Sequence, residues 1–133
     1  MADTAITVDN PLFGQGILVL EHYTSAALTA ATEKKEWVVP FNAVIREVIV
    51  DSETAGSGGT SDILDLNKNG TTVYTTQANR PTLLVGNTGK WTQAGKPEVT
   101  KVKAGDILSY DIDQICTTGS ARVKVVIVLA PSR

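Results

Sequence analysis

The chain of 133 residues carries a net charge of −2, with 42% hydrophobic and 20% charged residues, a composition typical of one folded soluble domain rather than of a disordered chain. Without a basic excess to neutralise phosphates, nucleic acid is not an expected partner. No apolar run reaches the roughly 18 residues of a membrane span, and the first residues lack the basic and apolar regions of a signal peptide, so we expect no membrane partner.

Residues 1–15 predict an extended N-terminal arm, because small, polar and turn-forming residues surround Pro11 and Gly14. The apolar run at residues 17–20 indicates a short buried strand. The stretch AALTAATEKKEW is the only one with helix-like composition. Its threonines dilute that composition and favour a loop or a single turn.

From Trp37 onward, apolar residues recur with a period of two, which indicates strands. Pro40 cannot donate to a strand ladder and is expected at an edge or a strand start. The alternation over residues 44–50 places two sets on opposite faces of one strand: Ile45, Glu47 and Ile49 against Val44, Arg46, Val48 and Val50.

The second half of the chain predicts a brief strand at residues 83–85, a turn at KAGD and two long strands. The first of these has Leu108, Tyr110 and Ile112 on one face and Ser109, Asp111 and Asp113 on the other. The last has Val123, Val125, Ile127 and Leu129 inward, with Arg122 and Lys124 outward.

About seven or eight antiparallel strands with turn signals between them predict an all-β sandwich or barrel. Residues 16–133 are expected to form this single domain, preceded by the arm at residues 1–15. The first and last long strands are the most apolar, which suits central positions in a sheet.

The stretch LDLNKNGTTV admits two interpretations. Asp65, Asn67, Asn69 and Gly70 match the opening of a calcium loop, but the twelfth position, where such a loop needs a bidentate Glu, is Thr76. The flanking sequence is also strand-like rather than helical. The metal-site interpretation is therefore rejected.

The same stretch predicts a β-hairpin, because Asn-Gly is the preferred pair of a type I′ turn. With Asn69 and Gly70 as the turn residues, Leu66 would face Val73 and Leu64 would face Thr75. Asn69-Gly70-Thr71 is also a glycosylation sequon, which we treat as coincidental without a secretion signal.

Four other patterns carry no site in our interpretation. VGNTGKW lacks two residues of a phosphate loop, because Leu84 and Trp91 stand where Gly and Ser or Thr are needed. Asp111 and Asp113 lie about 7 Å apart on a strand face, a spacing that a glycosidase could use, but they fit a solvated face better. His22 and Cys116 are the only residues of their types and lack partners for a triad or metal site. The sequence therefore predicts no catalytic, cofactor or metal residue, and no enzyme.

Three stretches, taken in order, resemble small jelly-roll proteins of tailed bacteriophages: VPFNAVIREVIVDSETAGSGGTSDILDLNKNGTTVYTTQANRPTL, VKAGDILSYDIDQI and ARVKVVIVL. The shared elements are a Gly/Thr loop, a D-x-N-x-NG-T hairpin, an RPT segment, an AGD-x-[IL] turn with its strand, and a Val-rich closing strand. The resemblance covers roughly residues 38–130 and includes none of the first 35 residues.

The resemblance implies a non-enzymatic head decoration (cement) protein that binds and stabilises the outer surface of a phage capsid. Its expected partners are the major capsid protein and two further copies of itself, and its expected place is the virion exterior after synthesis in the host cytoplasm. The alternative is a phage tail or fibre module that binds a host carbohydrate, for which Trp37, Trp91 and the tyrosines would have to form a stacking groove.

Overall fold

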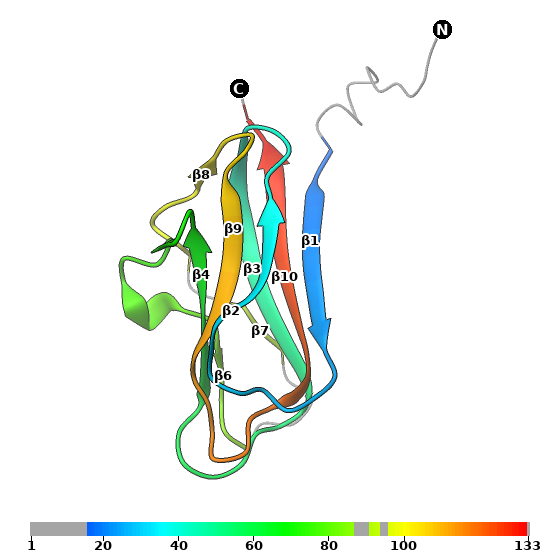
Figure 1. Ribbon diagram of the computed structural model, residues 1–133, viewed down its shortest axis with the longest axis vertical. Helices are drawn as coiled ribbons and strands as arrows, with labels where there is room; N and C mark the ends of the chain where they lie inside the picture. Colours follow the sequence, from blue (N-terminus) through cyan, green and yellow to red (C-terminus); the bar gives the residue numbers. More distant parts are fainter. Residues whose placement is uncertain (1–15, 87–90, 94–95, 133) are drawn as a thin grey trace, which may run out of the picture.

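The computed structural model describes residues 16–86, 91–93 and 96–132. Two antiparallel sheets stack face to face and form an elongated sandwich (Figure 1). The predicted arm at residues 1–15 lies outside the described residues. The strands are β1 (Leu18–Thr24), β2 (Ala31–Val38), β3 (Ala43–Thr54), β4 (Asp62–Lys68), β5 (Thr71–Thr72), β6 (Thr82–Leu83), β7 (Trp91–Gln93), β8 (Lys101–Val102), β9 (Ile107–Gln114) and β10 (Ala121–Pro131).

The strand order is that of a jelly roll. Sheet A runs β1-β10-β3-β7, with β8 also paired to β3, and sheet B runs β2-β9-β4-β5, with β6 also paired to β4. The short strands β7 and β8 both pair with β3, and the short strands β5 and β6 both pair with β4. If each such couple counts as one strand position, each sheet has four positions, as in the eight-stranded double Greek key. The predicted all-β, jelly-roll-like sandwich is confirmed.

The core lies between the sheets and comes from alternate residues of the long strands. Leu108, Tyr110 and Ile112 on β9 are buried, as predicted. The predicted inward face of β10 is also buried, and it consists of Val123, Val125, Ile127 and Leu129. The most apolar long strands, β3 and β10, pair with each other inside sheet A, which confirms their central position.

A β-bulge changes the predicted faces of β3. Glu47 pairs with Val128 but Ile45 pairs with Leu129, so Arg46 is an extra residue in this strand. On one side of the bulge the odd-numbered residue Ile45 points into the core, and on the other side the even-numbered residues Val48 and Val50 do so. The prediction that Ile45, Glu47 and Ile49 share one face is therefore wrong, because strict alternation does not survive the extra residue.

Two predictions in the first part of the chain are also wrong. The apolar run at residues 17–20 was expected to be a buried strand, but Ile17 precedes β1, and β1 is an edge strand whose residues alternate between half-buried and exposed. The stretch AALTAATEKKEW, residues 26–37, was expected to form a loop or a single turn, but residues 31–38 form β2, because pairing with β9 supplies their backbone partners. The brief strand expected at residues 83–85 is found as β6, one residue earlier.

The KAGD turn is confirmed by the N–H of Asp106, which donates to the carbonyl of Lys103 at 3.0 Å, and by the positive φ of Gly105. Pro40 was expected at an edge or a strand start, but it lies in the connection between β2 and β3, outside both strands. The described chain enters β1 and leaves β10 at the same end of the sandwich (Figure 1).

Candidate interaction surface

The Asn69–Gly70 pair forms the turn between β4 and β5. Their φ angles are 50° and 85°, as a type I′ turn requires. The N–H of Val73 donates to the carbonyl of Leu66 at 2.9 Å, and both side chains are buried. The predicted hairpin and its Leu66–Val73 pair are confirmed.

The second predicted pair of this hairpin is wrong. Thr75 is exposed and does not face Leu64. Leu64 N–H donates instead to the carbonyl of Pro81 at 3.0 Å. The hydrogen bonding between β4 and the strand after the turn thus ends at Val73, and the chain pairs with β4 again only at β6.

The polar side chains of this hairpin are bonded within the fold. Asp65 Oδ1 accepts from Thr72 Oγ1 at 2.7 Å, and Asn67 Nδ2 donates to Asp111 Oδ2 at 2.8 Å. Asn69 Nδ2 donates to Asp106 Oδ1 at 3.1 Å. Burial raises the pKa of Asp65. Among the described residues, no group of three or more His, Cys, Asp or Glu is arranged to hold a metal ion.

Asp111 and Asp113 border a shallow hollow of about 400 Å³ on sheet B, whose other lining residues are Ala30, Ala31 and Ile112. Asp113 forms an ion pair of 2.6 Å with Arg80, so its charge is matched within the fold. The residues that line this hollow beside the two aspartates are aliphatic, whereas sites that stack on ring-shaped ligands use aromatic side chains.

Three of the five aromatic side chains that a carbohydrate groove would need, Trp37, Tyr74 and Tyr110, are used in packing. Tyr74 and Tyr110 are buried, and Trp37 stacks on Tyr110 with ring centroids 6.1 Å apart. Tyr23 is the exposed tyrosine, and the side chain of Trp91 lies outside the described residues.

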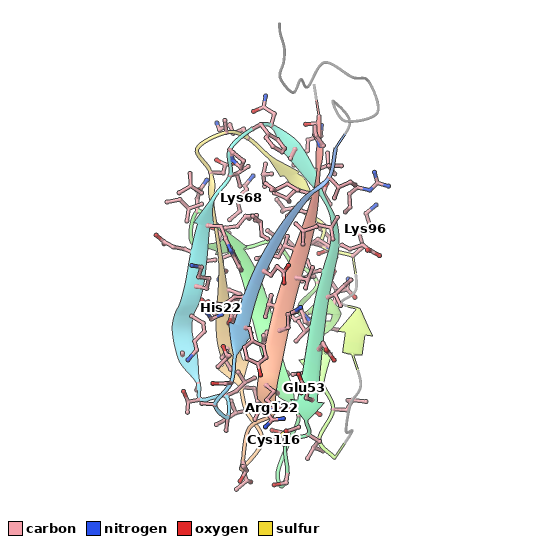
Figure 2. All side chains as sticks on the ribbon, turned by 90° about the vertical axis from the view of Figure 1, so that its right-hand side faces the viewer. His22, Glu53, Lys68, Lys96, Cys116 and Arg122 are labelled. Atoms are coloured by element: carbon pink, nitrogen blue, oxygen red, sulfur yellow. The ribbon has the colours of Figure 1, made fainter. Side chains whose placement is uncertain are left out.

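His22 links the two sheets at the margin between β1 and β2 (Figure 2). Its Nδ1 lies 2.6 Å from Tyr110 Oη, and the two rings are tilted with centroids 5.7 Å apart. Burial lowers the pKa of His22, and the charges of Lys35 and Lys34 lower it further. His22 is therefore half-buried and bonded to Tyr110, a core residue.

Cys116 is buried at 1% exposure, and burial raises the pKa of its thiol. It lies at the end of the sandwich shown at the bottom of Figure 2, the end where Arg122 and Glu53 are also labelled. Its backbone N–H donates to the carboxylate of Asp62 at 2.8 Å. Asp62 was not identified from the sequence as a structural residue. A carboxylate at the start of an apolar strand, directly after a Gly/Ser loop, could have indicated a buried, hydrogen-bonded position.

The exposed large apolar side chains gather in three places. Ile17, directly before β1, is 55% exposed, and Val19 and Tyr23 on β1 are 46% and 49% exposed. The other two groups are Val38 with its strand partner Ile107, and Leu84 with Val85. Because Val19 and Glu21 lie opposite the half-buried Val128 and Val126, the apolar surface of β1 continues onto β10. We name residues 17–24 with this unpaired margin the β1 edge.

A second surface feature is a hollow of about 420 Å³ lined by lysines, with Lys68, Lys101 and Lys103 beside Asn69 and Asp106. Lys68 Nζ donates to the carbonyl of Lys101 at 3.2 Å, and Asp106 Oδ2 accepts from the N–H of Lys103 at 2.9 Å. These contacts brace the turn between β8 and β9.

In the part of the chain that the structure describes, no helix is long and apolar enough to span a bilayer. No protein-family model matches the chain, and no curated protein matches its sequence.

Two solved structures share the fold. One is a chain of the cyanophage Pam1 capsid asymmetric unit, with 18% identity and a TM-score of 0.54, covering 88% of this chain and 87% of that one. The other is a chain of the capsid of Ralstonia phage GP4, with 16% identity and a TM-score of 0.55, covering 100% of this chain and 92% of that one. At these identities the likeness establishes a common jelly-roll fold.

Proposed function

We propose that this chain is a bacteriophage virion protein that binds the outer surface of a capsid and stabilises the shell as a trimer. The observation that carries the proposal is the jelly-roll fold shared, over 88% and 100% of the chain, with chains from two phage capsids. A fold alone does not define a function, so the proposal also needs support from the surface of this chain.

That support comes from two features of the described surface: its reactive polar side chains are bonded within the fold, and several large apolar side chains are exposed. The groups that could have served chemistry, Asp65, Asp111, Asp113 and His22, are engaged in hydrogen bonds or ion pairs inside the fold. The large apolar side chains left in solvent lie on or beside the edge strand β1, on the edge strand β2 with its partner Ile107 on β9, and in one loop. Such a surface favours a role in protein contact rather than catalysis.

Repetition on a shell would make a modest contact effective. Each subunit of a trimer bound to a symmetric shell gains from the attachment of the other two, because their binding becomes intramolecular. The arm at residues 1–15 adds a segment that can reach a neighbour or the major capsid protein, and strand addition is the contact mode that such an extension fits.

Co-sedimentation with empty, undecorated shells of the corresponding phage tests the proposal. We expect saturable binding at a fixed ratio to the major capsid protein, and a higher melting temperature of the shell. Shells already carrying their own full complement of this protein are the matched control and should take up none. Failure to bind undecorated shells at any concentration would show that the proposal is wrong.

A further inference from the structure

The β1 edge differs from the other margins of the two sheets. No described strand pairs with the side of β1 opposite β10, so a row of backbone N–H and C=O groups over seven residues has no strand partner within the described part of the chain. Natural proteins blunt such edges with short strands, charges or bulges, because an open edge recruits another strand.

The other margins are blunted in these ways. β5, β6 and β8 have two residues each and β7 has three. β2 is long, but it carries Lys34, Lys35 and Glu36 and its pairing with β9 has a register shift. β1 carries Glu21 and His22, but it is seven residues long, it pairs with β10 without a register shift, and it exposes Val19 and Tyr23.

The sequence outside the described structure contains a segment that fits this edge. Residues 4–9, TAITVD, alternate so that Ile6 and Val8 share one face, and the segment has two β-branched apolar residues and no proline. Fifteen residues precede Gly16, so six can form a strand while the others, including Pro11 and Gly14, span the gap to a neighbour.

Charge also favours this occupant. Lys34 and Lys35 lie close enough to β1 for their charges to act on His22. A strand added to the β1 edge would lie on the same margin of the sandwich as these lysines. Residues 1–15 include Asp3 and Asp9 and contain no Lys or Arg, so Lys34 and Lys35 would attract the arm, whereas Glu21 is already paired with Lys124.

We propose that residues 4–9 of one copy add as an extra strand to the β1 edge of the next copy, and that this contact repeats to close the trimer. The contact is head-to-tail, since the arm and the edge are different surfaces, and a threefold rotation closes such contacts into a ring. The number of copies, three, is taken from the proposed function, on which this inference therefore rests. The addition of a strand from one copy to another is tested on the isolated protein, without shells.

Two kinds of variant separate the donor from the acceptor. Thr7→Pro removes a backbone donor and the strand geometry from the arm, with Thr7→Val as its control. Val19→Lys places a charge on the β1 edge, and Val38→Lys is its control, because Val38 is at least as exposed but lies on β2. Tyr23→Lys is a second acceptor variant should Val19→Lys fail to fold.

Native mass spectrometry of the full-length chains gives the readout. We expect trimers for the wild type, Thr7→Val and Val38→Lys, and monomers with an unchanged fold for Thr7→Pro and Val19→Lys. A mixture of the two monomeric variants should form a one-to-one dimer, because one chain keeps its edge and the other keeps its arm. Hydrogen exchange at the β1 edge should be at least about tenfold slower in the wild type than in Thr7→Pro.

Three outcomes would overturn the inference: a monomeric wild type, a Thr7→Pro variant that remains trimeric, or a mixture that forms no dimer. A monomeric wild type with slow exchange at the β1 edge would mean that the arm folds back on its own β1. Shell binding is independent of these results. A protein that passes these tests but does not bind shells refutes the proposed function and leaves the arm exchange standing. A protein that binds shells but fails these tests refutes the arm exchange and leaves shell binding standing, and a monomeric wild type also refutes the trimer.

Discussion

The carboxylate of Asp62 accepts two hydrogen bonds from Ser120, one from its backbone N–H at 2.9 Å and one from its hydroxyl at 2.5 Å. Asp62 begins β4 in sheet B, whereas Ser120 immediately precedes β10 in sheet A. The same carboxylate binds the N–H of Cys116, and the Ser120 hydroxyl accepts from the N–H of Gly56 at 3.1 Å. This buried cluster fastens the two sheets at one end of the sandwich.

The substitution Asp62→Ala should lower the free energy of unfolding by about 3–5 kcal/mol, because it leaves buried donors without an acceptor. Ser120→Ala, which removes only the hydroxyl, should cost less, about 1–2 kcal/mol. Urea denaturation of both variants measures the difference. An Asp62→Ala protein as stable as the wild type would refute the role of this cluster.

Replacing Gly70 with valine should destabilise the β4–β5 turn by about 1–3 kcal/mol. The φ of Gly70 is 85°, and a Cβ there would meet no atom within 4 Å, so the expected loss comes from backbone strain and not from a clash. Gly70→Asn is the matched control, since asparagine tolerates this conformation, and it should lose less. Melting temperatures measure both.

Calcium should leave the melting temperature of the wild type unchanged. The carboxylate of Asp65 and the amides of Asn67 and Asn69 are already hydrogen-bonded to neighbouring groups, so binding an ion would break these bonds. A titration with millimolar calcium that raises the melting temperature would restore the metal-site interpretation of this hairpin.

Stability should fall as the pH drops below the ordinary pKa of histidine, about 6.5. The folded-state pKa of His22 is lowered by burial, and by Lys35 and Lys34, so at falling pH the unfolded chain takes up the proton first. The resulting stability is therefore complete above pH 6.5 and is lost as pH falls through the folded pKa.

The variant His22→Gln isolates this effect, since glutamine can accept the Tyr110 bond but does not titrate in this range. Chemical denaturation at pH 7.5 and pH 5.5 should show a smaller pH effect in the variant than in the wild type. An equal effect in both proteins would assign the pH dependence to other groups.

Cys116 should resist thiol reagents in the folded protein. It is 1% exposed, and burial raises the pKa of the thiol, which lowers the fraction of reactive thiolate. Absorbance with a chromogenic disulfide should show no rapid reaction until denaturant is added, and then one thiol per chain. Rapid labelling of the native protein would contradict the described burial.

The parts of the fold that sequence predicted depend on neighbouring residues. Asn69 and Gly70 define their turn because only a few residues tolerate positive φ at both positions. The inward faces of β9 and β10 follow from alternation, which needs no knowledge of a partner strand.

The parts that sequence missed depend on distant residues. β2 is a strand because β9 pairs with it, although AALTAATEKKEW alone favours no strand. The changed faces of β3 arise from one extra residue opposite β10. Asp62 finds its partners 54 and 58 positions away, and the apolar run of β1 could not reveal that one margin has no strand beside it in the described fold.

Cryo-electron microscopy of empty shells, with and without the added protein, tests the proposed capsid role most directly. The account predicts extra density on the outer surface that fits the two-sheet sandwich in groups of three, absent from the untreated shells. Identical maps with and without the protein, or density confined to the tail vertex, would contradict it.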